Sequence, residues 1–406
     1  MGNKPRIRFK GFTEDWEQRK LGSIGSTYTG LSGKTKEDFG HGEAQYITYL
    51  NVFQNTVSDI TMTDKVEIDT TQNEVKYGDV LFTTSSETPE EVGMSSVWLG
   101  HMPNIYLNSF CFGFRPNQKI DPYFLGYSLR APYMRDKIKI LAQGISRYNI
   151  SKNKVMELEI SMPNNEEQKL LGTFLQHIDL IITLHQCKLE KLKLMKKALL
   201  QKLFPKNGKH IPEIRFKGFT DAWEQCKLGD LAEIVRGASP RPISDPKWFD
   251  NDSNVGWLRI ADVTAQDGRI RYLEQKISEL GQEKTRVIKT PHLLLSIAAT
   301  VGKPVINYVP TGVHDGFLIF LNPKFNILYA FWWLEMFREK WNKYGQPGSQ
   351  VNLNSDLVKN QVINIPNEKE QEKISSFLES LDKIITLHQQ EPFLCGNSVN
   401  GGVVLC

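Results

Sequence analysis

The sequence predicts an α+β protein in which two globular α/β domains are separated by long coiled-coil helices, arranged as an internal pseudo-two-fold repeat. Three observations predict this fold. The chain has 406 residues, more than one ordinary hydrophobic core organises. Blocks from its first half recur in its second half, and a long helix-forming segment with a heptad pattern lies between the two halves.

The composition is that of a soluble globular protein. Hydrophobic residues make up 40% and charged residues 24% of the chain, and no apolar run reaches the roughly 18 residues that a membrane span needs. Residues 1–5 lack the apolar segment of a secretory signal, so we expect a cytoplasmic protein with no membrane association. The net charge of +4 permits nucleic-acid binding without requiring it. The five scattered cysteines argue against a disulfide framework or a cysteine zinc site.

The repeat is confined to particular blocks of each half. Ile-Arg-Phe-Lys-Gly-Phe-Thr at residues 7–13 returns unchanged at 214–220. The repeated blocks are 7–22 and 214–229, 160–168 and 363–371, and 181–186 and 384–389. Between them, residues 23–159 and 230–362 share little. An old duplication would instead lose similarity evenly, so the pattern favours a constant frame around a different insert in each half.

The segment from 168 to 203 is predicted to be one helix with a coiled-coil seam. It contains good helix formers, and its apolar positions alternate at spacings of four and three. At about 1.5 Å per residue it forms a rod of roughly 54 Å. His185 and Lys196 interrupt the seam, and polar residues at such positions often fix register or partner choice. The apolar seam positions are Leu171, Leu175, Ile178, Ile182, Leu189, Leu192 and Leu199.

A second helix begins in the same way and then departs. It repeats the seam with Ile374, Leu378, Leu381 and Ile385. Pro392 falls where the first helix has a leucine, and proline disfavours a helix interior by about 3 kcal/mol. We therefore expect a shortened helix over 367–390 and a non-homologous, disordered tail over 391–406.

The order of these blocks resembles the specificity subunits of type I restriction–modification systems, over nearly the whole chain up to Gln390. In each half the insert is preceded by a conserved lead, residues 7–22 or 214–229, that contains Trp-Glu and Lys-Leu-Gly. It is followed by the start of a helix that contains Pro-Asn and Glu-Gln. Motifs within the inserts are similar to the family's opening loop, early strand, and later strand and turn. They lie at 235–241, 256–263 and 293–303 in the second insert, with weaker counterparts at 46–52 and 78–84 in the first.

The resemblance implies a non-catalytic subunit in which each insert is a target-recognition domain for one half of a bipartite double-stranded DNA sequence. It implies that two methyltransferase subunits dock on the chain, that restriction subunits join them, and that S-adenosylmethionine, ATP and Mg²⁺ are bound by those partners. It also implies that the conserved helices pair antiparallel. The implied domains are 1–163 and 207–366, with the helices 164–206 and 367–390 and the tail 391–406.

Three pairs of segments offer groups for DNA contact. Bases are recognised by projecting donors and acceptors, and phosphates by Lys, Arg and backbone N–H groups. Each segment is also compatible with an ordinary surface loop. The candidates are Lys34, Thr35, Lys36, Arg236, Ser239 and Arg241 in the opening loops, Thr84, Ser85, Thr300 and Lys303 after the central strands, and Ser146, Arg147, Tyr148, Asn149, Ser349, Gln350 and Asn352 in the later turns.

Other features receive simpler interpretations. The lysine-rich run 188–202 is interpreted as a solvated or partner-binding helix face rather than a DNA clamp, and the aromatic cluster 331–341 as the buried side of a helix. Gly33-Lys34-Thr35 lacks the first glycine of a phosphate-binding loop, and Asp121-Pro122-Tyr123-Phe124 lacks one proline of a methyltransferase motif. The eight histidines show no metal-ligand spacing, so the sequence predicts no catalytic or metal site in this chain.

Two alternatives to a working specificity subunit remain open. The altered C-terminal helix is compatible with a partly or wholly inactive product of the same gene type, in which Leu171, Leu175 and Ile178 would be exposed and would weaken assembly or promote self-association. A coiled-coil scaffold without DNA affinity is the other alternative.

Overall fold

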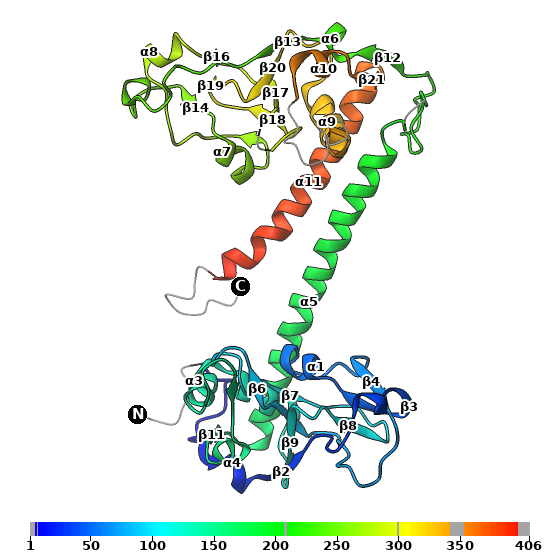
Figure 1. Cartoon of the computed structure of the whole chain (residues 1–406), viewed down its shortest axis with the longest axis vertical. Helices are drawn as coiled ribbons and strands as arrows, with labels where there is room; N and C mark the ends of the chain where they lie inside the picture. The colour runs from blue at the N-terminus through cyan, green and yellow to red at the C-terminus, as the bar shows by residue number, and fades with distance from the viewer. Residues whose placement is uncertain (1–4, 6, 207–208, 299, 342–352, 397–406) are drawn as a thin grey trace. The chain divides into compact units, whose positions relative to one another are not determined.

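A computed structural model describes residues 5, 7–206, 209–298, 300–341 and 353–396. The chain divides into two compact units, residues 1–184 and 185–406 (Figure 1). The division falls inside the long helix α5 (Asn165–Lys202), so the start of this helix belongs to the first unit and its end to the second. Among the described residues, no helix is long and apolar enough to cross a membrane.

The first unit is built on a four-stranded and a three-stranded sheet. The four-stranded order is β2 (Gly25–Thr29), β9 (Cys111–Pro116), β5 (Val80–Thr83) and β7 (Ser95–Val97). The other sheet has the order β4 (Thr63–Val66), β3 (Phe39–Ile47) and β8 (Ile105–Leu107). Every residue of β5 is buried, which explains its continuous apolar sequence. Helices α2 (Pro122–Arg130) and α3 (Pro132–Ile140) contribute to the same core.

The larger sheet of the second unit repeats the order of the four-stranded sheet and adds one strand at its edge. Its larger sheet consists of β13 (Glu233–Arg236), β20 (Phe317–Leu321), β17 (Leu293–Ser296), β18 (Pro304–Asn307) and β15 (Arg269–Ile270). Its smaller sheet consists of β14 (Gly256–Trp257), β19 (Thr311–Val313) and β16 (Arg286–Ile288). The two-domain α+β fold predicted from the repeat is thus the fold observed.

The repeated blocks form the same two-stranded sheet in each unit. Strand β1 (Glu17–Lys20) pairs antiparallel with β11 (Glu159–Met162), and Glu17 lies opposite Met162. Strand β12 (Glu224–Lys227) pairs with β21 (Val362–Ile365) in the equivalent register, with Glu224 opposite Ile365. The N-terminal lead and the segment before each long helix therefore close around the insert, as the constant frame predicts.

A buried ion pair explains why arginine and glutamate recur in these blocks. Arg8 Nε lies 2.6 Å from Glu167 Oε1, and Arg215 Nε lies 2.7 Å from Glu370 Oε1. Both carboxylates are fully buried at the first turn of their helices, α5 and α11 (Glu368–Gly396). A buried carboxylate requires a paired cation, so each pair fixes its lead to the helix start.

The glutamine after each glutamate joins the insert to the same helix start. Gln168 Oε1 accepts a 3.1 Å hydrogen bond from the backbone N of Asp121, and Gln371 Oε1 accepts a 2.9 Å bond from that of Asn326. Asp121 also caps α2 by accepting from the backbone N of Phe124. The Asp-Pro-Tyr-Phe motif is therefore a helix start, with proline in its favoured first position.

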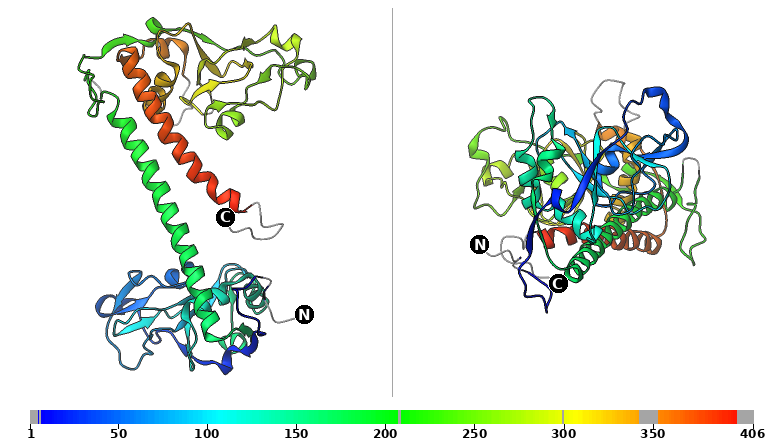
Figure 2. Two further views of the ribbon diagram at one scale, coloured as in Figure 1. Left: turned by 180° about the vertical axis from the view of Figure 1, so that it is seen from behind. Right: turned by 90° about the horizontal axis from the view of Figure 1, so that it is seen from below.

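Within the second unit, the end of α5 packs antiparallel against α11 (Figures 1 and 2). The ring centroids of His185 and His388, which are equivalent in the repeat, lie 5.9 Å apart. Lys196, which follows His185 along α5, bonds to Asp382, which precedes His388 along α11, so the two helices run in opposite directions. The antiparallel pairing implied by the family resemblance is confirmed here. On the α11 side the seam residues Ile374, Leu378, Leu381 and Ile385 are all buried.

Helix α9 (Ile327–Trp341) fills the core between the second sheet and these helices. Its aromatic residues are buried, as predicted from the sequence. Trp332 and Trp341 are among the largest fully buried side chains of the described chain, and the cluster includes Leu203 of the α5 end and Leu378 of α11. The second domain and its helices therefore share one hydrophobic core.

Two boundaries differ from the prediction. The expected strand over 256–263 is only the two residues of β14, because Asp262 accepts a 2.9 Å hydrogen bond from the backbone N of Arg259 and starts helix α7 (Ile260–Ala265). The expected end of the last helix at Gln390 is also wrong, since α11 continues to Gly396. The single bond that Pro392 removes is a local cost, which does not end the helix there. Residues 397–406 lie outside the described residues.

Candidate functional site

The opening loops of the two domains have the same backbone arrangement. The N–H of Leu31 donates to Leu107 O at 2.8 Å, and that of Ala238 donates to Val313 O at 3.0 Å. The residue before each of these is a glycine packed against a carbonyl group. A Cβ atom on either Gly30 or Gly237 would lie 2.1 Å from a backbone oxygen, of Asn108 and His314 respectively. Only glycine fits such an approach, so the glycines fix each loop against the end of its sheet.

In the first domain the structure brings several candidate residues together beside this loop. A cavity of about 310 Å³ is lined by Ser32 and Thr84, among others. Strand β6 (Ser85–Ser86) follows Thr84 and pairs with β10 (Tyr148–Asn149), with Asn149 opposite Ser85. The opening loop, the segment after the central strand and the later turn therefore form one surface, as a shared binding site requires.

The tip of that surface carries both charge and exposed apolar area. The guanidinium of Arg147 lies 5.8 Å from the ring centroid of Phe110, and the side chains of Ser146 and Arg147 are exposed. Thr84 Oγ1 donates to Phe110 O at 2.8 Å, which anchors the segment beneath the ring. Ile145 and Phe110 are both exposed, so the tip offers cationic, hydroxyl and apolar groups to a ligand.

The other candidates of the first opening loop have structural partners. Lys34 Nζ lies 2.8 Å from Asp69 Oδ2, and this contact, with further hydrogen bonds from Thr71, holds the pKa of Asp69 well below its ordinary range. Thr35 caps the short helix η2 (Lys36–Asp38) through its backbone N and hydroxyl, both of which donate to Asp38. Lys36 is exposed.

In the second domain the candidates of the opening loop converge on one residue, Asp315. Ser239 Oγ donates to Asp315 Oδ1 at 2.6 Å, Arg241 Nη2 donates to Asp315 Oδ2 at 2.7 Å, and Arg236 Nε donates to the backbone oxygen of Asp315 at 2.6 Å. The hydrogen bond from Ser239 and the charge of Arg241 lower the pKa of Asp315. Ser239, Arg241 and Asp315 line a cavity of about 300 Å³.

The remaining candidates of the second domain are placed elsewhere. Lys303 is buried, and its Nζ lies 2.6 Å from Asp267 and 3.3 Å from Glu335. Thr300 Oγ1 lies 3.3 Å from Ser296 Oγ. The amine of Lys303 is therefore engaged inside the domain, away from the opening loop. The turn residues Ser349, Gln350 and Asn352 lie outside the described residues.

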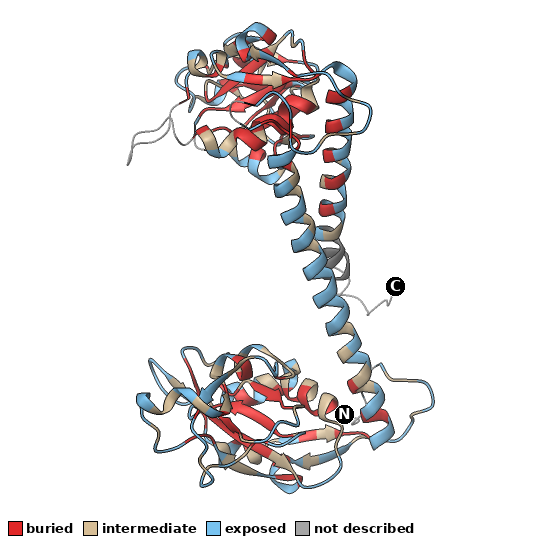
Figure 3. Ribbon diagram, turned by 90° about the vertical axis from the view of Figure 1, so that its right-hand side faces the viewer, coloured by how far each residue is buried: buried red, intermediate tan, exposed pale blue. Residues whose placement is uncertain are grey.

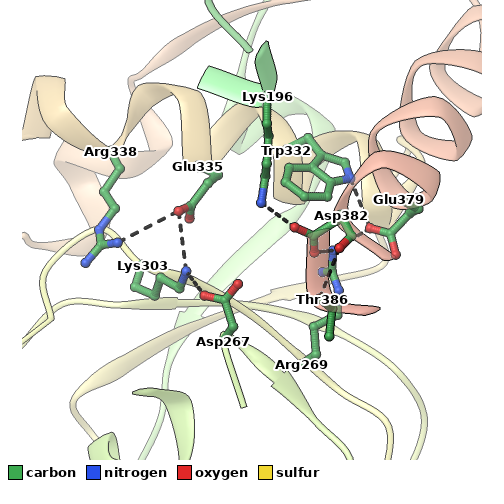
Figure 4. Close-up of polar contacts among 10 residues, drawn as sticks. All are labelled: Lys196, Asp267, Arg269, Lys303, Trp332, Glu335, Arg338, Glu379, Asp382 and Thr386. Carbon is green, nitrogen blue, oxygen red and sulfur yellow. Dashed lines mark hydrogen bonds and ion pairs between the residues drawn. The ribbon is translucent and has the colours of Figure 1, made fainter. Parts of the chain in front are cut away.

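A polar network that sequence reasoning missed joins the second domain to its helices (Figure 4). Arg269 Nη2 bonds to Glu379 of α11, and Trp332 Nε1 donates to the same carboxylate at 3.0 Å. Lys196 of α5 bonds to Asp382 and lies 4.8 Å from the Trp332 ring centroid. Burial raises the pKa of Glu379 despite its neighbour Arg269. The seam interruption at Lys196 was the only sequence signal for this network.

The first domain contacts its helix through the equivalent positions. Gln176 of α5 donates to Tyr123 Oη at 2.9 Å, and Tyr127 Oη donates to Asp179 Oδ2 at 2.7 Å. These helix positions correspond in the repeat to those of Glu379 and Asp382. Each recognition domain is therefore attached to its conserved helix at the same two positions, with different chemistry.

The fold and the two matched loops define a protein that presents two related but chemically different surfaces. A family model for the type I restriction modification DNA specificity domain matches residues 13–194 and 220–393. The chain belongs to this family, and the resemblance stated from its motifs is confirmed. Among the described residues, no group of three or more histidine, cysteine and acidic side chains is placed to hold a metal ion.

Known relatives cover nearly all of the chain. A candidate MjaX type I restriction enzyme specificity subunit of Methanocaldococcus jannaschii is 25% identical over 393 residues, 93% of this chain and 89% of the relative. The structure is similar to the type I restriction–modification S subunit from M. genitalium, with a TM-score of 0.55 and 14% identity over 95% of this chain and 94% of that one. The HsdS subunit from Thermoanaerobacter tengcongensis gives a TM-score of 0.51 and 18% identity over 93% and 91%. The two structural likenesses support the fold.

Proposed function

We propose that this specificity subunit recognises a bipartite DNA sequence, one half-site with each domain, and scaffolds the catalytic subunits of a type I restriction–modification complex. One observation carries the proposal: the opening loops have the same backbone geometry but different side chains. The first surface offers Arg147 and Ser32, whereas the second offers Arg236 and Arg241. A constant frame with variable contact groups suits recognition of two different base sequences.

A second observation supports the scaffolding role. A stripe of apolar side chains is exposed at the same positions of both conserved helices. These residues lie in the identical Ile-Ile-Thr-Leu-His-Gln block or before it. Two copies of one partner would find the same surface twice, as expected for two methyltransferase subunits. The stripe consists of Phe174, Ile181 and Leu184 on α5 and of Phe377, Ile384 and Leu387 on α11.

In this proposal the chain itself is not catalytic. The methyltransferase subunits bind S-adenosylmethionine, and the restriction subunits that join the complex bind ATP and Mg²⁺. The contribution of this chain is to place them at a defined distance from the two half-sites. Since the phosphate backbone supplies much of the affinity of such complexes, DNA binding is expected to weaken steeply with salt.

The test is co-expression with a cognate methyltransferase subunit in a host that lacks adenine methylation, followed by single-molecule sequencing of the genome. Methylation confined to one split motif is the expected result. A complex that assembles without methylating DNA would contradict recognition, and failure of the complex to assemble would favour an inactive product with an altered C-terminus. An Ile181→Asp, Ile384→Asp double variant is expected to lose the methyltransferase while the purified chain remains folded.

A further inference from the structure

We infer that one face of α5 is a docking site for an amphipathic helix from another polypeptide, running antiparallel to α5 and carrying leucines in a heptad and a lysine that meets Asp179. The face consists of Leu175, Ile178 and Ile182 with Asp179 among them. This inference goes beyond the proposed function and does not depend on it, because it concerns a helix face and not DNA.

The repeat shows that this face belongs in an interface. The seam residues of α11 are all buried, whereas on α5 Leu175 and Ile182 are exposed and Ile178 is half-buried. Figure 3 shows buried residues along α11 and mostly exposed residues along α5. Leu378 is 0% exposed, whereas Leu175 is 36% exposed. Ile385 is 6% exposed, whereas Ile182 is 48% exposed. Exposing a row of large apolar side chains is unfavourable, and the same row is buried where a helix lies against it.

The structure also shows what kind of segment covers the seam. On α11, helix α9 packs on one side, and the end of α5 lies against the seam, where Lys196 bonds to Asp382. Leu200 at that end and Leu203 just after it are buried in the same core as Leu378, and Leu189, Leu192 and Leu199 are half-buried. This chain does not repeat that leucine- and lysine-rich segment. The positions equivalent to Leu189, Leu192, Lys196, Leu199 and Leu203 are Pro392, Cys395, Val399, Gly402 and Cys406.

Charge complementarity specifies the lysine. Asp382 receives Lys196 from the end of α5, and the two side chains are about one-fifth exposed. Asp179 occupies the equivalent position of α5, exposed, and accepts a hydrogen bond from Tyr127. The sequence has no lysine or arginine after Lys383, so residues 384–406 do not offer Asp179 a cation. A docking helix with lysine at that position reproduces the observed contact.

A second copy of this chain is a poorer occupant. Its own leucine- and lysine-rich segment already packs on its α11, through Lys196 and Leu203, and would have to leave that core first. A partner with a free segment has no such cost. An isolated helix of this length is marginally stable in water, so we expect the partner segment to fold on binding.

The test uses the full chain and a fluorescent peptide with the sequence of residues 186–204. Fluorescence anisotropy should show saturable binding of one peptide per chain. Asp179→Lys should weaken binding at least about tenfold, and a peptide carrying Lys196→Asp should restore it, since opposite charges are then paired again. Leu175→Asp with Ile182→Asp should abolish binding. The control, Ile181→Asp with Leu184→Asp, alters the neighbouring stripe and should leave the peptide affinity unchanged.

Three results would overturn the inference. The first is no binding of the peptide, or binding that ignores both the Asp179→Lys substitution and the reversed pair. The second is a dimer by light scattering that Leu175→Asp dissociates, which would make a second copy the occupant. The third is displacement of the peptide by the methyltransferase subunit, which would assign the face to that partner. If the Lys196→Asp peptide binds the Asp179→Lys chain, that chain is folded, so weak binding of the original peptide to it cannot be due to misfolding.

Discussion

The two opening loops share the same backbone arrangement but carry side chains of different chemistry. Gly30 and Gly237 pack against carbonyl groups in the same way, yet the first loop places Lys34 on Asp69, whereas the second gathers two arginines on Asp315. The difference shows that the frame determines where a contact surface lies and that the insert determines which groups it presents. In the proposed function, this separation is what would let two half-sites be recognised independently.

The two conserved helices, α5 and α11, show where equivalent residues have equivalent contacts and where they do not. Their first turns are equivalent contact for contact, because both partners of each contact lie within the repeat. Beyond the first turns the burial of equivalent residues diverges, because α11 is covered by α9, which belongs to the divergent insert, and by the end of α5, which is present once in the sequence. Equal sequence gives equal burial only where the neighbour is repeated too.

The seam offers the largest expected contrast. Leu378→Ala removes a fully buried side chain and should destabilise the second unit by about 2–5 kcal/mol. Leu175→Ala, at the equivalent but exposed position, should cost less than about 1 kcal/mol. Denaturant unfolding followed by hydrogen exchange in each unit measures both. Equal losses would mean that the α5 seam is covered in solution by a second copy.

The ion pairs of the frame test the opposite expectation, that equivalent positions behave alike. Glu167→Gln and Glu370→Gln each leave an arginine without its carboxylate partner, so each should lower the stability of its own unit by a similar amount. Hydrogen exchange of strands β1 and β12 reports the two losses separately. A large difference between the two variants would show that the frames are not energetically equivalent.

A pH response should distinguish the second loop from the first. His314 Nδ1 accepts a 2.9 Å hydrogen bond from the backbone N of Gly316, which requires the neutral ring. Burial lowers the pKa of His314, so its contribution to stability is present above the unfolded pKa of about 6.5 and is lost as the pH falls through the folded pKa. The protection of the β19 and β20 amides, measured against the intrinsic exchange rate at each pH, should therefore fall in mild acid.

The matched control for this response is His314→Gln, which does not titrate in this range. The variant should exchange at the same rate across the interval, apart from the intrinsic effect of pH. If wild type and variant respond alike, the loop is not sensitive to His314.

The smallest expected effect concerns phosphate contacts. In the assembled complex, Arg241→Ala should weaken DNA binding similarly for all sequences and reduce the slope of log affinity against log salt by about one. Lys36→Ala is the corresponding test in the first loop. Fluorescence titrations at several salt concentrations measure both, and an unchanged slope in either variant would remove that residue from the candidate DNA contacts.

The sequence predicted those features that the chain itself displays twice. The frame, the long helix and the seam follow from repeated blocks and heptad spacing, and Lys196 was recognised as a polar interruption of the seam but not as part of a network. By contrast, the convergence on Asp315 and the burial of Lys303 depend on tertiary neighbours within one insert, and the bond between Arg269 and Glu379 joins an insert residue to α11. No internal copy reveals such pairs, and residues far apart in sequence carry no local signal of contact.

The central claim is that one frame holds two independent DNA readers, and an exchange of one insert tests it most directly. Residues 230–362 would be replaced by the second insert of another family member, and the methylated motif would be mapped in the co-expression host. The account predicts a split motif in which only one half changes, while the other half and the spacing persist. A change in both halves, or a motif that does not respond to the exchange, would contradict it.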